Sequence, residues 1–129
     1  MRKLIKVNDK DLGRFGEKLS SLYLIAKGYK IRERNYWTNT GEIDIICQKR
    51  KMIVFVEVKT RKNTKYISPK ENIDFRKLGK IRKTAQTYID RLCHIDYDYR
   101  IDCIEVCMDK ALPRIRHLKA IGYQIDDYK

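Results

Sequence analysis

Three residues near the middle of the sequence could do chemistry together: Asp44, Glu57 and Lys59. Two carboxylates supply hard oxygen ligands to Mg²⁺, which binds few protein groups and keeps several waters. A lysine beside them can orient or deprotonate an attacking water, or stabilise charge that develops on a phosphate. This set suits metal-assisted cleavage of phosphodiester bonds. An ordinary salt bridge on a solvated face is the alternative, and the short pattern alone favours the salt bridge.

Two strand-like runs would bring these side chains together. Residues Glu42–Cys47 and Met52–Lys59 both show the period-two alternation of half-buried strands, and the basic segment Gln48–Lys51 joins them. A turn of about four residues is a normal hairpin length, so the two runs should pair antiparallel. This pairing predicts that Asp44 and Glu57 lie near each other on one face.

A first helix is predicted over residues 10–27, with Gly28 as its C-terminal stop. Its apolar stripe consists of Leu12, Phe15, Leu19, Leu22, Tyr23 and Ala26. A second stripe consists of Gly13, Glu17, Ser20 and Leu24, and its small residues would let this side approach another backbone closely. Glu17 is either a solvated acid or an acid aimed into a cleft, and periodicity alone favours the solvated position.

The remaining elements complete an α/β pattern. Strands are predicted over 29–37, 97–108 and 114–119, and a second helix over about 69–93, opened by a capping pattern at Ser68 and Pro69. The order α-β-β-β-α-β-β predicts one domain with a small mixed sheet flanked by helices. Its core covers about 11–121, followed by a polar tail at 122–129. The second helix begins with Arg76, Lys77, Lys80, Arg82 and Lys83, a basic face that is either solvated or opposite an anion.

Charge and composition indicate the kind of partner. The chain has 129 residues, a net charge of +13 and a pI of about 9.7, which favour a polyanionic partner such as nucleic acid. A membrane surface is disfavoured, because no lipidation signal, spanning segment or hydrophobic signal core is present. We therefore expect a cytoplasmic protein. Tyr36 and Trp37 could stack on unpaired bases, although a core position is the commoner role of aromatic residues.

The four cysteines do not form a metal-binding pattern. Cys103 and Cys107 would lie on one strand face about 13 Å apart, which is too far to share a zinc ion. The sequence contains no CxxC pair. We expect no zinc, and we expect the cysteines to be buried free thiols.

Several blocks of the sequence, in this order, resemble the YraN-like uncharacterised bacterial family. The blocks are GRFGE (13–17), GYKIRERNY (28–36), GEIDII (41–46), VFVEVKTR (54–61), RK (76–77), RIDCIEV (100–106) and HLKAI (117–121). That family is similar to archaeal Holliday junction resolvases of the PD-(D/E)xK nuclease superfamily. The resemblance implies a restriction-endonuclease-like fold and a Mg²⁺-dependent endonuclease, with Mn²⁺ as a substitute, that acts on branched DNA. It also implies a homodimer, because resolvases cut two strands symmetrically.

The resemblance assigns roles position by position. It makes Asp44 and Glu57 the metal-binding carboxylates, the Val58 carbonyl a third ligand and Lys59 the catalytic lysine. Glu17 becomes the helical acid that reaches the same cleft and orders the hydration shell of the ion, in contrast to its solvated position by periodicity. Four basic residues become phosphate contacts: Arg14, Arg34, Arg61 and Lys77.

Two other functions remain open from the residues. The first is a nucleic-acid-binding module that does not cut, in which the basic face binds phosphates and the carboxylates are structural. The second is an adaptor for an acidic protein or the ribosome, since net charge alone does not separate DNA, RNA and acidic surfaces.

Overall fold

The computed structural model describes residues 9–62, 75–92 and 96–121. The elements are α1 (Asp9–Ala26), β1 (Lys30–Thr38), β2 (Gly41–Lys49), β3 (Met52–Arg61), α2 (Phe75–Arg91), β4 (Asp98–Cys107) and β5 (Arg114–Leu118). The predicted helices and strands are therefore confirmed within the described residues. The capping pattern at Ser68 and Pro69, the first part of the predicted second helix, and the tail 122–129 lie outside them.

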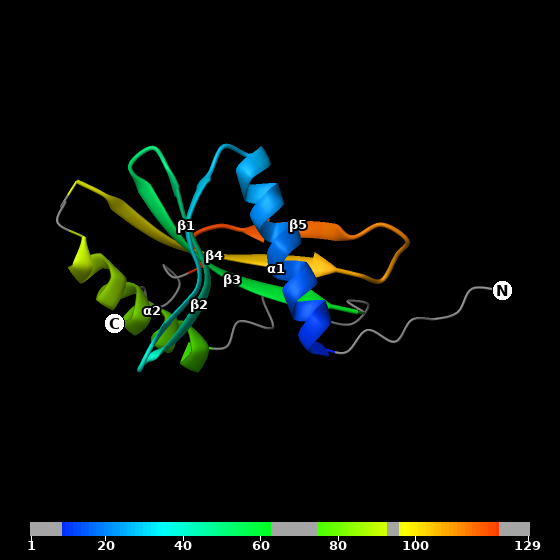
Figure 1. The fold of residues 1–129 in the computed structure, drawn as a ribbon, viewed down its shortest axis with the longest axis horizontal. Helices are drawn as coiled ribbons and strands as arrows, with labels where there is room; N and C mark the ends of the chain where they lie inside the picture. The colour runs from blue at the N-terminus through cyan, green and yellow to red at the C-terminus, as the bar shows by residue number, and fades with distance from the viewer. Residues whose placement is uncertain (1–8, 63–74, 93–95, 122–129) are drawn as a thin grey trace.

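The strands form one five-stranded sheet in the order β1-β2-β3-β4-β5 (Figure 1). Neighbouring strands pair antiparallel except β3 and β4, which are parallel. A parallel pair needs a crossover connection, and α2 lies in the connection between β3 and β4. The α/β class with a small mixed sheet is confirmed. No helix in the described part of the chain is long and apolar enough to cross a lipid bilayer.

The turn between β2 and β3 is shorter than the predicted segment Gln48–Lys51. The ladder continues to the pair Lys49–Met52, so only Arg50 and Lys51 connect the strands. Arg50 takes a left-handed backbone conformation with φ of 55°. Two-residue hairpin connections need positive φ because that backbone matches the twist of the flanking strands. The prediction of a turn of about four residues was wrong, because the basic residues of the turn give no sign in the sequence of the positive φ that a two-residue connection needs.

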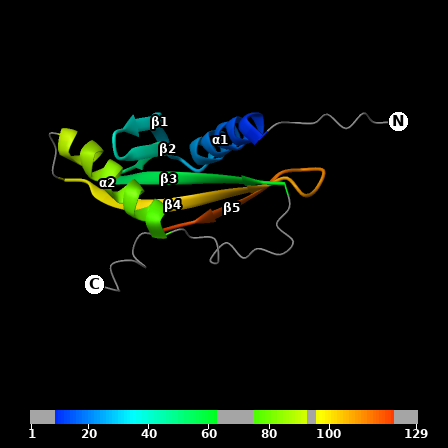
Figure 2. The same cartoon turned by 90° about the horizontal axis from the view of Figure 1, so that it is seen from below.

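Two hydrophobic clusters cover opposite faces of the sheet. The cluster on the α1 side consists of Leu24, Tyr29, Ile45, Cys47, Val54, Val56, Ile104 and Val106. The cluster on the α2 side consists of Ile43, Ile46, Ile53, Phe55, Ile81, Ala85 and Tyr88. Successive residues of β3 alternate between the clusters, as the pleat of a strand requires. The two helices therefore lie on different faces of the sheet (Figure 2).

The buried side of α1 follows the predicted apolar stripe only in part, because Leu19 and Tyr23 pack against the core while other residues of the stripe are exposed. Phe15 and Leu22 are 43% and 55% exposed, whereas Ser20 and Leu24 of the second stripe are fully buried. The cause is the closeness of α1 to β3. A Cβ atom built on Gly16 would lie 1.8 Å from the Thr60 hydroxyl oxygen. Small residues occupy the side of α1 that contacts β3, because larger apolar side chains do not fit there.

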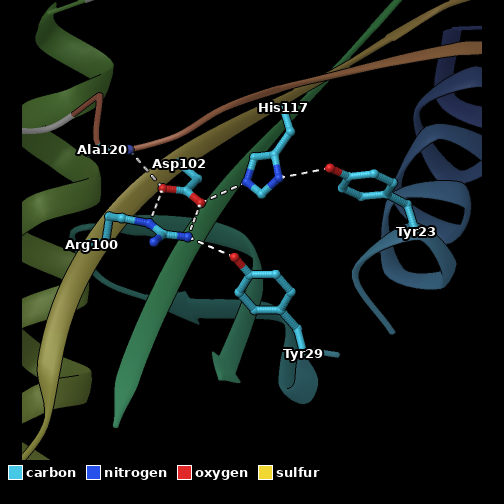
Figure 3. A network of polar contacts seen from close by, with 6 residues as sticks. All are labelled: Tyr23, Tyr29, Arg100, Asp102, His117 and Ala120. Carbon is cyan, nitrogen blue, oxygen red and sulfur yellow. Dashed lines mark hydrogen bonds and ion pairs between the residues drawn. The ribbon is translucent and has the colours of Figure 1, made fainter. Parts of the chain in front are cut away.

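A buried polar network lies on the α1 side of β4 and joins β4 to β5 (Figure 3). The Asp102 carboxylate, which is fully buried, accepts hydrogen bonds from the Arg100 guanidinium at 2.8 and 2.9 Å and from the Ala120 amide at 2.9 Å. Nε2 of His117 lies 2.7 Å from the same carboxylate. Two tyrosine hydroxyls extend the network, Tyr23 to His117 Nδ1 (3.1 Å) and Tyr29 to Arg100 (2.9 Å). The network fastens the edge strand to the sheet.

Three cysteines, Cys47, Cys103 and Cys107, are buried free thiols, as predicted, and Cys93 lies outside the described residues. Burial raises the pKa of Cys47 and of Cys103 to about 12 each. Thiols with such pKa values stay protonated and unreactive at neutral pH.

Candidate functional site

The site begins where β2 changes the face that it presents. Ile43 packs in the α2-side cluster and Ile45 in the α1-side cluster, although residues two apart in a regular strand share a face. The strand therefore rotates at Asp44. The neighbouring strand turns at the same level, where Asn35 takes a left-handed conformation with φ of 51°. Asparagine tolerates that conformation better than other non-glycine residues.

The ladder between β2 and β3 stops at this point. Its last pair is Ile45 with Val56, so the strands separate beyond it. The Asp44 side chain enters this opening, where its Oδ2 accepts a hydrogen bond from the Val58 amide at 2.8 Å. The carboxylate thus satisfies a backbone donor that has lost its strand partner, which fixes Asp44 against β3.

Two surface hollows meet at Asp44. The α2 hollow, of about 390 Å³, is lined by Gly41, Glu42, Asp44, Glu57, Arg76, Lys77, Lys80 and Ile81. The α1 hollow, of about 320 Å³, is lined by Arg14, Glu17, Lys18, Ser21, Arg34, Asn35, Asp44 and Ile45. Each hollow is lined by acids and by three lysines or arginines. Because Asp44 lines both, its carboxyl is the common centre of the site.

The electrostatics of the site show that its acids are close together. Burial raises the pKa of Asp44 from 3.8 to about 7, with further upward contributions from the charges of Glu57 and Glu17. Burial also raises the pKa of Glu17, and the charge of Glu42 adds to that increase. The Asn35 amide, with its nitrogen turned toward the two glutamates, donates to Glu42 and Glu17 at 3.2 Å each. The acids therefore lie near one another in a partly desolvated place.

Lys77 of α2 contacts this group of acids. Glu57, which is only 5% exposed, forms an ion pair with the Lys77 ammonium group. The charge of Lys77 also lowers the pKa of Asp44, against the larger effects of burial and Glu57. The basic start of α2 therefore faces acids of the sheet, and Lys77 balances part of their negative charge.

The structure brings most of the predicted site residues to these two hollows, but not all of them. Arg14, Arg34 and Lys77 line them, whereas Arg61 forms an ion pair with the buried Glu105 at 3.1 Å. Lys59 follows Glu57 on the same face of β3 and pairs in register with Glu105 of β4. It lies close enough to Cys103 to lower that thiol's pKa, and it is outside both hollows.

Some site residues were missed by reasoning from the sequence. Asn35 connects two acids of the site, and Glu42 lines the α2 hollow. Lys18 and Lys80 complete the basic linings. An asparagine inside an otherwise regular strand is a usable signal, because asparagine is depleted in strands and marks irregular backbone. For Lys18 no signal separates it from the many other basic residues, whereas Lys80 belongs to the basic face predicted for the second helix.

The chemistry of the donor set fits a hard cation. Asp44, Glu57, Glu17 and the Val58 carbonyl offer only oxygen ligands, and burial together with neighbouring carboxylates raises the pKa of Asp44 and of Glu17. Within the described residues, no three carboxylate, imidazole or thiol side chains stand ready as a complete metal site. Mg²⁺ would suit such a site, since it uses one or two carboxylates and keeps several waters.

Comparison with known proteins gives the family. The model of the uncharacterised protein family UPF0102 matches residues 16–106. A UPF0102 protein of Syntrophomonas wolfei is 39% identical over 110 residues, which is 85% of this chain and 96% of the relative. One of Caldanaerobacter subterraneus is 44% identical over 116 residues, covering 88% and 95%, and one of Clostridium botulinum is 48% identical over 102 residues, covering 78% and 83%. The chain belongs to the UPF0102 family, the YraN family that its sequence blocks resemble.

Proposed function

We propose that this protein is a metal-dependent nuclease that hydrolyses phosphodiester bonds, with branched DNA as the substrate. The observation that carries the proposal is the position of Asp44. It lies where two hollows meet, and both hollows are lined by lysines and arginines. A chain of phosphates fits such a surface, because basic linings on two sides can hold the backbone while acids at the centre bind a cation.

The residues have distinct roles in the proposed reaction. Asp44, Glu57 and the Val58 carbonyl would hold Mg²⁺ or Mn²⁺, with Glu17 ordering its hydration shell. When bound, the cation supplies Lewis acidity toward the scissile phosphate and makes water a better nucleophile. Lys59 orients the attacking water or stabilises charge on the phosphate.

Lys77 changes partner in this scheme. In the structure its ammonium group neutralises Glu57. If Glu57 held a cation, it would no longer need Lys77 for charge balance, and Lys77 could then contact a phosphate. Arg14 and Arg34 of the other hollow fix the register of the backbone without reading the sequence.

A second candidate function is a nucleic-acid-binding module without turnover. Two observations favour it. Asp44 has a structural task in accepting the Val58 amide, and Glu57 has a structural partner in Lys77. Both acids therefore have a role that needs no cation. The basic linings of the two hollows serve this function equally well.

Comparing metal-dependent cleavage by the wild-type protein and by the Asp44→Asn variant distinguishes the two functions. The asparagine oxygen still accepts the Val58 hydrogen bond, so the variant should fold while losing one cation ligand. Wild-type protein and variant are incubated with a labelled four-way junction, a flap and a blunt duplex while Mg²⁺ or Mn²⁺ is titrated. Asp109→Asn is the matched control, because Asp109 is exposed in the β4–β5 turn, where it pairs with Arg114.

The nuclease predicts cleavage that requires the metal, survives in Asp109→Asn and disappears in Asp44→Asn. DNA affinity in EDTA should stay equal or rise in Asp44→Asn, because an anion leaves a phosphate-binding surface. Binding of the three substrates without cleavage by any of the proteins would instead establish the binding module.

A further inference from the structure

Trp37, near the tip of the β1–β2 hairpin, is a large aromatic surface turned toward solvent. It is 70% exposed, although a buried tryptophan would gain far more from the hydrophobic effect. It lines a third hollow, the hairpin hollow, together with Thr38, Asn39, Thr40, Thr87 and Arg91. The other residues of this lining are polar or basic, so the ring is the apolar part of a hydrophilic surface.

The hairpin tip that carries Trp37 is firmly attached to α2. Thr38 and Thr40 share a hydrogen bond between their hydroxyls at 2.8 Å, and Thr40 bonds the Thr84 hydroxyl of α2 at 2.8 Å. Thr84 is fully buried and donates to the Lys80 carbonyl at 2.9 Å. This chain of hydroxyls orders the turn in advance, so a ligand on Trp37 would meet a surface that loses little freedom on binding.

Trp37 is also close to the acidic site along the hairpin. It lies opposite Glu42 in the β1–β2 register, and Asp44 is two residues further along β2. Two residues of strand span about 7 Å, which is about two stacked nucleotides at 3.4 Å each. A base on Trp37 would therefore have its neighbouring phosphates beside the acids of the proposed nuclease.

Positively charged residues line the hairpin hollow and the α2 hollow. Arg91 lines the hairpin hollow with its guanidinium 5.9 Å from the centre of the Tyr36 ring. Lys80, whose carbonyl anchors Thr84, lines the adjoining α2 hollow. An aromatic platform joined to a basic groove is the combination by which proteins bind single-stranded nucleic acid, since every base can stack and every phosphate can pair.

We infer that Trp37 stacks on an unpaired nucleobase about two nucleotides from the scissile phosphate, so that the substrate carries a single-stranded segment at the site. The inference rests on the proposed nuclease function and specifies its substrate class. Tryptophan and arginine are also frequent anchors of protein interfaces. Arg91 in the hairpin hollow favours nucleic acid over a protein partner, as does the basic lining of the α2 hollow, which includes Gly41 next to Thr40.

Because Trp37 is the single tryptophan of the chain, intrinsic fluorescence reports on it alone. Oligothymidylate, a flap and a blunt duplex are titrated into wild-type protein in EDTA, so that no cleavage occurs. Oligothymidylate and the flap should quench the emission, whereas the duplex should quench it much less. Anisotropy of labelled oligonucleotides then gives affinities for three variants, Trp37→Ala, Trp37→Phe and Leu112→Ala. Leu112 is 78% exposed in the β4–β5 turn and is the matched control.

Trp37→Ala should weaken oligothymidylate binding by roughly 5- to 150-fold, the loss that corresponds to one base–aromatic stack. Trp37→Phe should retain most of the affinity, and Leu112→Ala all of it. Binding without quenching, or an equal loss on oligothymidylate and duplex in Trp37→Ala, would overturn the inference and leave the nuclease intact. Failure of wild-type protein to bind any of the three nucleic acids would remove both, and quenching by an acidic protein alone would assign Trp37 to a protein interface.

Discussion

Replacing Asp44 by asparagine should make the protein more stable at neutral and alkaline pH while leaving its stability at low pH nearly unchanged. The folded-state pKa of Asp44, about 7, lies above its ordinary value of 3.8 because of burial and the charge of Glu57. Ionising Asp44 therefore opposes folding. The cost is absent below pH 3.8, grows as the pH rises and is complete above about pH 7.

The two pKa values set the size of the effect. Each pH unit of separation corresponds to about 1.36 kcal/mol, so the complete cost is on the order of 4 kcal/mol. Part of it already acts at pH 5. Between about pH 5 and pH 8 the advantage of Asp44→Asn over wild type should grow by on the order of 2–3 kcal/mol. The variant retains an acceptor for the Val58 amide, so loss of that hydrogen bond does not mask the gain.

Urea unfolding in EDTA at several pH values between 5 and 8 measures this difference. The linear extrapolation gives the free energy of unfolding of each protein at each pH. Asp109→Asn serves again as the control, since its exposed carboxylate pairs with Arg114 and its pKa is lowered, not raised. A difference between Asp44→Asn and wild type that stays constant over this range would refute the assignment of Asp44 as a desolvated acid among other acids.

Two further predictions concern the elements that position the site. Gly16→Ala should lower the free energy of unfolding by about 1–3 kcal/mol, because the new Cβ meets Thr60 and rotating Thr60 only exchanges its hydroxyl for its methyl. A Cβ on Gly13 meets nothing within 4 Å, so Gly13→Ala should be neutral or stabilising by up to about 1 kcal/mol. Equal effects of the two substitutions in urea unfolding would contradict the close packing of α1. Asp102→Asn should cost about 3–5 kcal/mol in the same assay, because Arg100 loses its buried counter-ion, and a cost below about 1 kcal/mol would show that the network is not coupled to folding.

Much of the fold follows from local patterns. The alternation in β1, β2 and β3 predicted their extent, because a strand with one buried face must repeat every two residues. The short connection between the two central runs also predicted that β2 and β3 pair antiparallel. The same logic predicted the buried face of α1 only in part, since Leu19 and Tyr23 pack against the core whereas Phe15 and Leu22 are exposed. Hydrophobic spacing measures which residues avoid water, whereas the contact side of this helix is chosen by how closely its backbone approaches Thr60.

The acids of the site could be found from the sequence, but their setting could not. A regular pleat places Asp44 on one face of the sheet, and no pattern in the sequence indicates that β2 rotates at this residue. The partner of Glu57 was equally hidden, because Lys77 reaches it only after α2 has crossed over the sheet. Several neighbouring basic residues of α2 are equivalent by composition, and the tertiary packing alone selects Lys77.

The parallel pairing of β3 with β4 has a consequence for how the chain avoids aggregation. The antiparallel strands β1, β2 and β3 are joined by short turns and can form early, whereas β4 must wait for the long crossover to close. Until then β3 is an open edge with an apolar run, Ile53–Val56, of the kind that recruits other chains. The cations Lys49, Arg50 and Lys51 directly precede β3 in the sequence. Charge at that place repels a second copy, so this turn can protect the nascent sheet as well as connect it.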